Sequence, residues 1–199
     1  MSTWPLLSLL TFLPLVGALL LLFIRGTPEE VARNCRNVAL LFTSIIFLLS
    51  LKVLFLYDPT NGAFQLIEKH EIIKGLFSYH VGVDSISLSL IVLTTFLMPV
   101  AILASRHVTV RVREYLIAFL MLETMMIGTF TSLNIMLFYV FFEAVLIPMY
   151  LIIGVWGGPR RVYASFKFFL YTLLGSILML LALIVIYRQT GTTDMTELL

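Results

Sequence analysis

Charged side chains are scarce in this chain: only 12% of its 199 residues are Asp, Glu, Lys or Arg, whereas 60% are hydrophobic. A mean hydropathy of +1.05 excludes both a soluble globular domain and a disordered chain. The single cysteine, Cys35, lies in a predicted basic loop and permits no intrachain disulfide and no Cys-x-x-Cys site. A net charge of +2 from dispersed basic residues gives no basis for nucleic-acid binding. The composition indicates a multi-pass membrane protein.

Histidine is also rare, and the three present (His70, His80 and His107) are in predicted loops without the spacing of metal ligands. The segment 157–159, Gly-Gly-Pro, lacks the Walker pattern and is typical of a helix end. We therefore expect no metal site and no cofactor site in this chain. The first apolar run has no basic segment before it and no cleavage site after it, so we expect a permanent helix rather than a signal peptide.

The sequence contains long apolar runs. Six are close to the roughly 20 residues needed to cross about 30 Å of hydrocarbon. They cover residues 4–24, 38–57, 86–104, 115–133, 135–155 and 168–187. Because only helices satisfy the backbone of such segments internally, the predicted fold is an all-α membrane domain over residues 1–199, with six transmembrane helices. Between the fourth and fifth spans, Thr131, Ser132 and Asn134 predict a tight turn.

The only long loop, 58–84, opens with turn signals at Asp58-Pro59 and Asn61-Gly62 and then mixes apolar and charged residues. A short hairpin and an interfacial helix both fit it, and periodicity does not decide between them.

Basic residues predict the orientation, because cytoplasmic loops carry an excess of Lys and Arg. The first, third and fifth loops hold three each, nine of the thirteen: Arg25, Arg33, Arg36, Arg106, Arg111, Arg113, Arg160, Arg161 and Lys167. The opposite side has Lys52, Lys69, Lys74 and Arg188. We expect the odd loops in the cytoplasm and both ends of the chain on the other side.

Two acids interrupt the apolar spans. Glu123 in the fourth and Glu143 in the fifth each lie ten residues from Leu133, which places both about 15 Å from the joining turn. A carboxylate at this depth costs about 2.5 to 3.5 kcal/mol on insertion scales and is a functional-site hypothesis by default. Burial and a second nearby carboxyl both favour the neutral form, so one group would be neutral at pH 7 if both face the same interior. A carboxyl group whose neutral and charged forms are both populated near pH 7 can accept and release a proton.

The alternative interpretation is that each glutamate is protonated and hydrogen-bonded between helices. Position favours the relay for Glu143: Tyr139 and Tyr150 share its face, and Pro148 cannot donate to the carbonyl of Ala144. A loosened helix beside a buried acid leaves room for water. Glu123 has no comparable polar stripe, so packing and relay remain equal alternatives there.

Other polar residues have structural readings. Ser165, Thr172 and Ser176 form a weak polar face, which close packing aided by Gly175 explains better than a wet path. Asp84 is expected to cap the third span, with an electrostatic link to another element as the alternative. Lys52 is expected to snorkel, and Lys167 is either a snorkelling anchor or a buried charge.

Three segments carry a family resemblance: VGVDSISL at 81–88, MLETMMIG at 121–128, and FFEAVLIPMYLIIGVWGGPRRVYASFKFFLYTLLGS at 141–176. They resemble the subunit M family of bacterial respiratory complex I, the proton-pumping NADH:quinone oxidoreductase, whose mitochondrial counterpart is the fourth ND subunit. The chain resembles the N-terminal part of that roughly fourteen-helix, antiporter-like fold. The outer loop departs from the family, with Asp84-Ser85 where Asp-Gly is frequent and without a common tryptophan.

The resemblance implies that Glu143 is essential to proton transfer and pairs with a lysine on a later helix, and that Glu123 is a second membrane carboxylate. It implies no redox centre here; FMN, iron–sulfur clusters and quinone are expected in partner subunits. It also implies L- and N-type antiporter-like subunits as partners and the bacterial inner membrane as the location, with both ends periplasmic.

The main hypothesis is therefore a proton-translocating membrane subunit of this enzyme. The alternatives are a subunit of a multi-subunit cation/proton antiporter, and a non-transporting scaffold with both acids permanently protonated.

Overall fold

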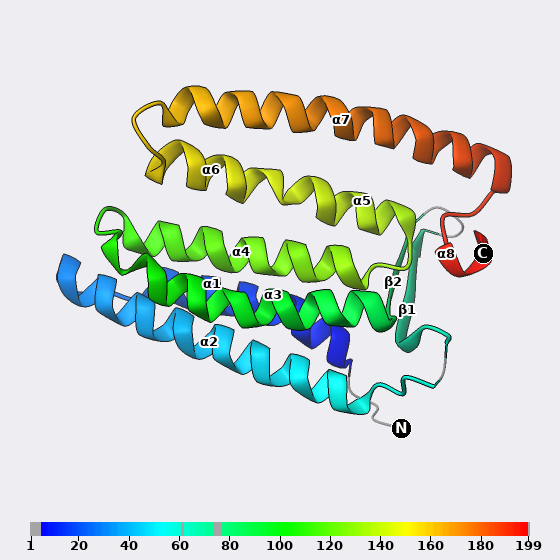
Figure 1. Ribbon diagram of the computed structural model, residues 1–199, viewed down its shortest axis with the longest axis horizontal. Coiled ribbons are helices and arrows are strands. Elements are labelled where there is room, and N and C mark those ends of the chain that lie inside the picture. Colours follow the sequence, from blue (N-terminus) through cyan, green and yellow to red (C-terminus); the bar gives the residue numbers. More distant parts are fainter. Residues whose placement is uncertain (1–4, 61, 74–76, 199) are drawn as a thin grey trace.

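The computed structural model describes residues 5–60, 62–73 and 77–198 and contains six helical spans lying side by side, with a β-hairpin at one end (Figure 1). Trp4, Asn61 and Lys74 lie outside the described residues. The helices are α1 (Leu6–Phe23), α2 (Pro28–Leu56), α3 (Ser85–Ala104) with the 3-10 turn η1 (Ser105–His107), α4 (Val112–Thr131), α5 (Ile135–Ala144), α6 (Leu146–Trp156), α7 (Arg161–Thr190) and α8 (Met195–Leu198). Since α5 and α6 together make one span, the predicted six spans are confirmed.

Two helices extend well beyond the apolar runs. α2 begins at Pro28, where Thr27 and Glu30 form a capping box and proline occupies the first helical position. The prediction that Cys35 lies in a loop is therefore wrong, because Cys35 is buried on α2. α7 likewise starts seven residues before the predicted span. Hydropathy detects the part of a helix inside hydrocarbon, whereas the cap decides where the helix begins.

Short polar residues cap two other helices, as predicted for Asp84. Asn134 caps α5, its side-chain oxygen accepting from the backbone N–H groups of Met136 at 3.0 Å and Leu137 at 3.1 Å. Asp84 caps α3 by accepting from the Ser87 N–H at 2.8 Å. Both contacts satisfy N–H groups that a helix terminus leaves free.

The core lies mainly among α1 to α4, with further side chains from β2 and α5, and divides into two apolar clusters along the helices. One, near the hairpin, includes Leu10, Ile46, Ile91 and Ile127. The other, near the opposite end, includes Leu21, Ala39, Ile102 and Leu120. α1 packs against α4 and α2 against α3. α7 packs on α6 at the edge of the array and leaves most of its side chains exposed (Figure 1).

The outer loop forms a hairpin, which answers the alternative that periodicity left open. β1 (Gln65–Ile73) pairs antiparallel with β2 (Phe77–Val83), and Lys69 lies opposite His80. The carboxylate of Glu68 accepts from the backbone N–H groups of Leu7 at 2.8 Å and Ser8 at 3.2 Å. Glu68 therefore supplies the side-chain cap that Pro5, at the start of α1, cannot.

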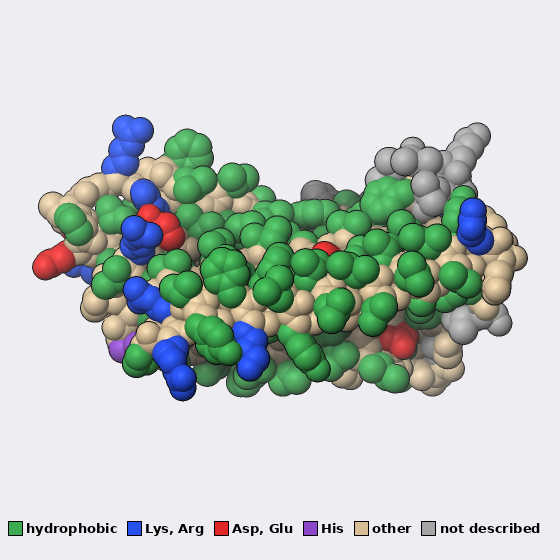
Figure 2. Space-filling view, turned by 90° about the horizontal axis from the view of Figure 1, so that it is seen from above, with side chains coloured by type: hydrophobic (Ala, Val, Ile, Leu, Met, Phe, Trp, Pro, Cys, Tyr) green, Lys and Arg blue, Asp and Glu red, His purple; other side chains and the backbone are tan. Residues whose placement is uncertain are grey.

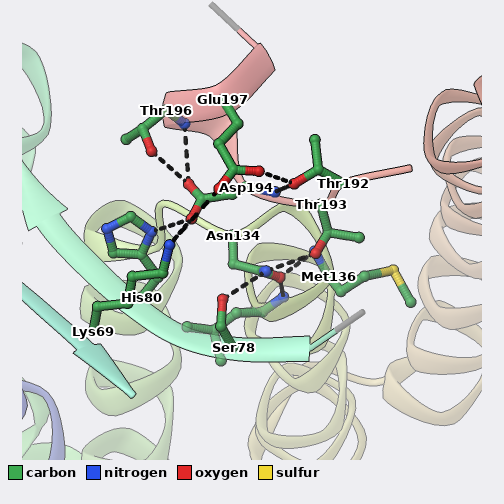
Figure 3. A network of polar contacts seen from close by, with 11 residues as sticks. Lys69, Ser78, His80, Asn134, Met136, Thr192, Thr193, Asp194, Thr196 and Glu197 are labelled. Atoms are coloured by element: carbon green, nitrogen blue, oxygen red, sulfur yellow. Dashed lines mark hydrogen bonds and ion pairs between the residues drawn. The ribbon is translucent and has the colours of Figure 1, made fainter. Parts of the chain in front are cut away.

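A polar network fastens the segment after α7 to this hairpin (Figure 3). Asp194 lies 2.7 Å from the Lys69 ammonium and 2.9 Å from Nδ1 of His80, and it also accepts from the N–H and hydroxyl of Thr196. The Asn134 amide donates to the hydroxyls of Ser78 and Thr193 at 3.0 and 2.8 Å. The turn between α4 and α5 is thus held between β2 and the segment after α7.

The charge of Asp194 is stabilised by these contacts. Burial raises the pKa of Asp194, but the hydrogen bonds from Lys69 and Thr196 and the nearby His80 outweigh it and hold the pKa at about 2. The same hydrogen bond, given by Lys69, raises the pKa of Lys69. Because the folded pKa of Asp194 lies below its ordinary 3.8, this stabilisation is complete above about pH 4 and is lost as the pH falls toward 2.

Asp194→Asn is expected to loosen the segment 192–198, since it removes the negative charge that faces Lys69 and His80. The pKa shift corresponds to stabilisation on the order of 2 kcal/mol, or about 30-fold faster backbone hydrogen exchange if this contact limits opening. Relative to the intrinsic exchange rate at each pH, the protection of 192–198 in the wild type should stay constant from pH 7 to about 4 and fall below it.

Asp58→Asn provides the control, because Asp58 lies in the same outer loop and, in the described part of it, bonds to the nearby Thr60 and Gln65. Unchanged exchange of 192–198 in Asp194→Asn would contradict the assigned role of the network.

Candidate functional site

Glu123 interrupts the buried seam of α4 between the two apolar clusters. Leu116, Leu120, Glu123 and Ile127 are separated by four, three and four residues, so they share one face of the helix. Leu116 and Leu120 belong to the cluster far from the hairpin, and Ile127 belongs to the cluster near it. Glu123 is fully buried. The Glu123 carboxyl group therefore lies between the two apolar clusters, along the length of α4.

No hydrogen-bond partner among the described residues reaches this carboxyl group. Both oxygens of Glu123 and the hydroxyl of the adjacent Thr124 are buried and unpaired. A buried polar group without a partner costs free energy, and an ionised one costs far more. Three states of the Glu123 carboxyl would avoid this cost: it can hold a proton, accept a hydrogen bond from water, or pair with a group outside the described residues.

Glu143 lies in the last turn of α5 and is half-buried. Its Oε2 atom is buried and has no hydrogen-bond partner among the described residues. Glu143 is eight residues after the first residue of α5, and Glu123 is eight residues before the last residue of α4. Because the two helices are antiparallel neighbours joined by a short turn, equal rise places the carboxyl groups at similar depth.

The hydrogen bonding of the helix that carries Glu143 is interrupted directly beyond it, although Val145 keeps helical backbone angles. α5 ends at Ala144 and α6 begins at Leu146, with Val145 as the shared end residue. The Val145 N–H bonds to the carbonyl of Phe141 at 3.2 Å, and the Met149 N–H bonds to the carbonyl of Val145 at 3.3 Å. Pro148 has no N–H to give to the Ala144 carbonyl between them. The loosened turn predicted from Pro148 is confirmed by this break.

α4 and α5 meet closely between the two acids and the connecting turn. A Cβ atom on Gly128 would lie 2.5 Å from the ring of Phe141, so no larger residue fits at Gly128 without displacing the ring. Phe141 and Leu137 also pack into the cluster that contains Ile127. The contact aligns the helices that carry the two glutamates.

Among the described residues, no cation forms an ion pair with either acid. Residues 115–155 contain no Lys, Arg or His. Among the described residues, the ion pairs all lie in the network around Asp194. The lysine partner implied by the resemblance is therefore not supplied by the described part of this chain.

The remaining polar residues of the last span serve packing. Ser165, Thr172 and Ser176 each bond back to a carbonyl of α7 itself, and Ser165 faces Gly154 of α6. The expectation that Gly175 aids this packing is wrong, because a Cβ there would meet open space; Gly154 has that role. Lys167 is exposed, with its ammonium 5.8 Å from the ring centre of Tyr163, so it is not a buried charge in this chain.

Sequence reasoning missed the polar network around Asp194. His80 was identified only as a loop histidine, yet it is buried on β2. Asp194 follows His80 by 114 residues, and only tertiary contact joins them. No local pattern marks such a pair.

Two family models together match nearly the whole chain. The model described as NADH-ubiquinone oxidoreductase chain 4, amino terminus, matches residues 9–131, and the model described as NADH:quinone oxidoreductase/Mrp antiporter, TM, matches residues 132–199.

Relatives of known name are similar over the same length. NADH-quinone oxidoreductase subunit M of Rhodobacter capsulatus is 53% identical over 98% of this chain, and NADH-ubiquinone oxidoreductase chain 4 of Arabidopsis thaliana is 45% identical over 97%. The aligned region covers 38% and 39% of those proteins, so this chain spans about two fifths of the length of the curated relatives it matches.

Solved structures share the fold. A chain of respiratory complex I from Thermus thermophilus with bound NADH superposes with a TM-score of 0.81 at 28% identity, covering 96% of this chain and 38% of that one. A chain of an archaeal membrane-bound sulfane sulfur reductase superposes with a TM-score of 0.74 at 21% identity, which shows a common fold alone. With more than half of its residues matched by the first family model, the chain belongs to the NADH-ubiquinone oxidoreductase chain 4 family, in which its relatives include bacterial subunit M.

Proposed function

We propose that this chain is part of a proton-translocating, antiporter-like membrane subunit of an NADH:quinone oxidoreductase, with Glu143 as a reversible proton carrier. The observation that carries the proposal is the coincidence of a buried, unpaired carboxyl oxygen with a proline-loosened helical turn at membrane depth. Proline inside a transmembrane helix is tolerated where neighbouring helices, polar side chains or ordered water satisfy the backbone group that it frees. A span that served only as an anchor would gain nothing from either feature.

The chemistry follows from what each group can hold. In its neutral state Glu143 keeps a proton on the carboxyl, and in its charged state it needs a cation nearby. The lysine implied by the family resemblance would supply that cation when close and would favour the neutral form when it withdraws. The carbonyl of Ala144, left without its helical donor by Pro148, can accept a hydrogen bond from water that delivers the proton.

Glu123 is proposed as a second carrier at similar depth. Both of its oxygens are buried without a partner among the described residues, so each is free to accept a hydrogen bond from water or to hold a proton.

Electron transfer is assigned to other subunits. The proposal places FMN, iron–sulfur clusters and quinone in partner subunits and expects no redox group in this chain. Its neighbours would include the L- and N-type antiporter-like subunits, and the chain would respond to quinone reduction through charge and conformation.

The proposed location is the bacterial inner membrane. Loops rich in arginine lie at the end of the helix array opposite the hairpin, and Lys and Arg side chains gather at one end of the face in Figure 2. Because positive loops face the cytoplasm, the hairpin and both ends of the 199-residue segment are proposed to be periplasmic.

A cation/proton antiporter subunit is the second candidate, because the family model over residues 132–199 is shared with Mrp antiporters. The partners discriminate the two. Purification of the intact complex together with subunits that contain flavin and iron–sulfur clusters supports the oxidoreductase, and a complex without them supports the antiporter.

Glu143→Gln in the intact complex is expected to abolish proton pumping while assembly and helix insertion persist, because glutamine keeps the size of the side chain but cannot carry the proton. Glu143→Asp should weaken pumping. Proton uptake into vesicles measures both. Glu114→Gln, an exposed acid at the start of α4, is the matched control.

Full proton pumping by the Glu143→Gln complex would contradict the proposal. Infrared titration gives a second check, since a Glu143 carboxyl band that does not change from pH 5 to 9 would support the scaffold alternative.

Glu123→Gln is expected to reduce pumping by less than Glu143→Gln, with little change in thermal stability, because the amide fits the same buried space. Parallel measurements of pumping and of the melting temperature separate the two roles. Unaltered pumping would assign Glu123 to helix packing.

Pro148→Ala should restore an N–H donor for the Ala144 carbonyl and join α5 to α6. We expect pumping to fall several-fold and thermal stability to hold or rise, because the helix gains a hydrogen bond and loses its loosened turn. Pro99→Ala, which replaces a proline inside α3, is the control and should leave pumping unchanged. Normal pumping by Pro148→Ala would show that the loosened turn takes no part in proton transfer.

A further inference from the structure

A pocket of about 590 Å³ lies between α2 and the end of α3, at the end of the array opposite the hairpin. Arg33, Arg36 and Arg106 line it, together with one acid, Glu29. None of the three arginines forms an ion pair within the described residues. The lining therefore carries a net charge of about +2, and its arginines have no ion-pair partner among the described residues.

Arg36, one of the three arginines that line the pocket, is held in place by hydrogen bonds. One terminal nitrogen of Arg36 donates to the backbone carbonyls of Arg106, at 3.2 Å, and Val108. Carbonyl oxygens satisfy donors without cancelling the positive charge. The bonds also hold η1 and the loop after it against α2, so the pocket is bounded by two tied elements.

The pocket changes from charged to apolar with depth. On α2, Leu40 follows Arg36 by four residues, and near the end of α3, Ile102 precedes Arg106 of η1 by four residues. Each wall therefore places an arginine about one turn outside an apolar residue. Leu103, which also lines the pocket, is 45% exposed.

Depth in the bilayer follows from the length of α2. Its 29 residues span about 44 Å, compared with about 30 Å of hydrocarbon. The excess of roughly nine residues corresponds to its polar first turns, which hold Arg33 and Arg36. The charged rim then lies at the level of lipid headgroups, and the apolar floor lies at the start of the acyl chains.

We propose that this pocket binds the phosphodiester headgroup of an anionic phospholipid, with the start of an acyl chain against Leu40 and Leu103. Guanidinium groups pair well with phosphate oxygens, and anionic lipids are attracted to basic clusters next to membrane helices. A free phosphate ion has the same charge chemistry but would leave the apolar floor in contact with water. The inference does not depend on proton transfer at Glu143.

The test uses the intact membrane complex in phosphatidylcholine vesicles with a limiting amount of photoactivatable phosphatidylglycerol. Peptide mapping is expected to find the label in residues 28–40 and 102–112. Arg33→Gln/Arg106→Gln should lower this labelling by about 30-fold, since each basic residue near the surface contributes about fivefold. Arg36 is left intact because it holds the neighbouring loop.

The matched control is Arg160→Gln/Lys167→Gln, which removes two charges from the start of α7 on the far side of the array (Figure 1). It should leave the labelling unchanged. Equal labelling by a phosphatidylcholine probe, or unaltered labelling of the Arg33→Gln/Arg106→Gln complex, would overturn the proposal.

Competition on the wild type keeps the test independent of how the variants assemble. Unlabelled phosphatidylglycerol should displace the probe, whereas inorganic phosphate should not. Displacement by inorganic phosphate would identify a soluble anion as the occupant and would also overturn the assignment to a lipid.

Discussion

The rest of this structure depends on one constraint: a polar group within hydrocarbon must find its partner inside the protein. The helices satisfy the backbone, and most hydroxyls in the spans follow the same rule. Thr11, Thr43 and Ser176 donate to carbonyls of their own helices, and Ser50 bonds to Thr95 across α2 and α3. Against this background, the unpaired atoms of Glu123, Thr124 and Glu143 are exceptions. They mark the part of the spans where this rule is not met, and they include the two carboxyl groups proposed to carry protons.

At the two ends of the helix array, polar groups can bond to water, so the polar contacts there serve to hold the loops and helix ends in place. At the hairpin end, opposite charges do this: Lys69 and His80 hold Asp194, and Glu68 caps α1. At the other end, arginines bond to backbone carbonyls, as Arg36 does to the loop after α3 and Arg161 does to Val155. The first arrangement neutralises charge, whereas the second leaves positive charge available to the headgroup region.

Rigid and loosened parts of the interior lie next to each other. Gly128 and Phe141 lock α4 onto α5, while the break at Val145 begins only four residues further along. This arrangement holds the two carboxyl groups at similar depth and still admits a hydrogen-bonding change beside one of them. Helix α7, largely exposed in this chain, adds packing through Ser165 and Gly154 but brings no charge to either acid.

The sequence by itself determined the membrane class, the six spans, the polar turn at 131–134, the cap at Asp84, and the loosening at Pro148. These features follow from local chemistry: the length of apolar runs, short polar side chains near free N–H groups, and a missing N–H. Only the tertiary structure decided that the outer loop is a hairpin, that Glu123 lies between two apolar clusters, and that His80 meets Asp194. It also decided that Arg33 and Arg36 continue α2 and line a pocket with Arg106. These outcomes depend on contacts between residues tens of positions apart, and the free energy of such contacts leaves no periodic trace along the chain.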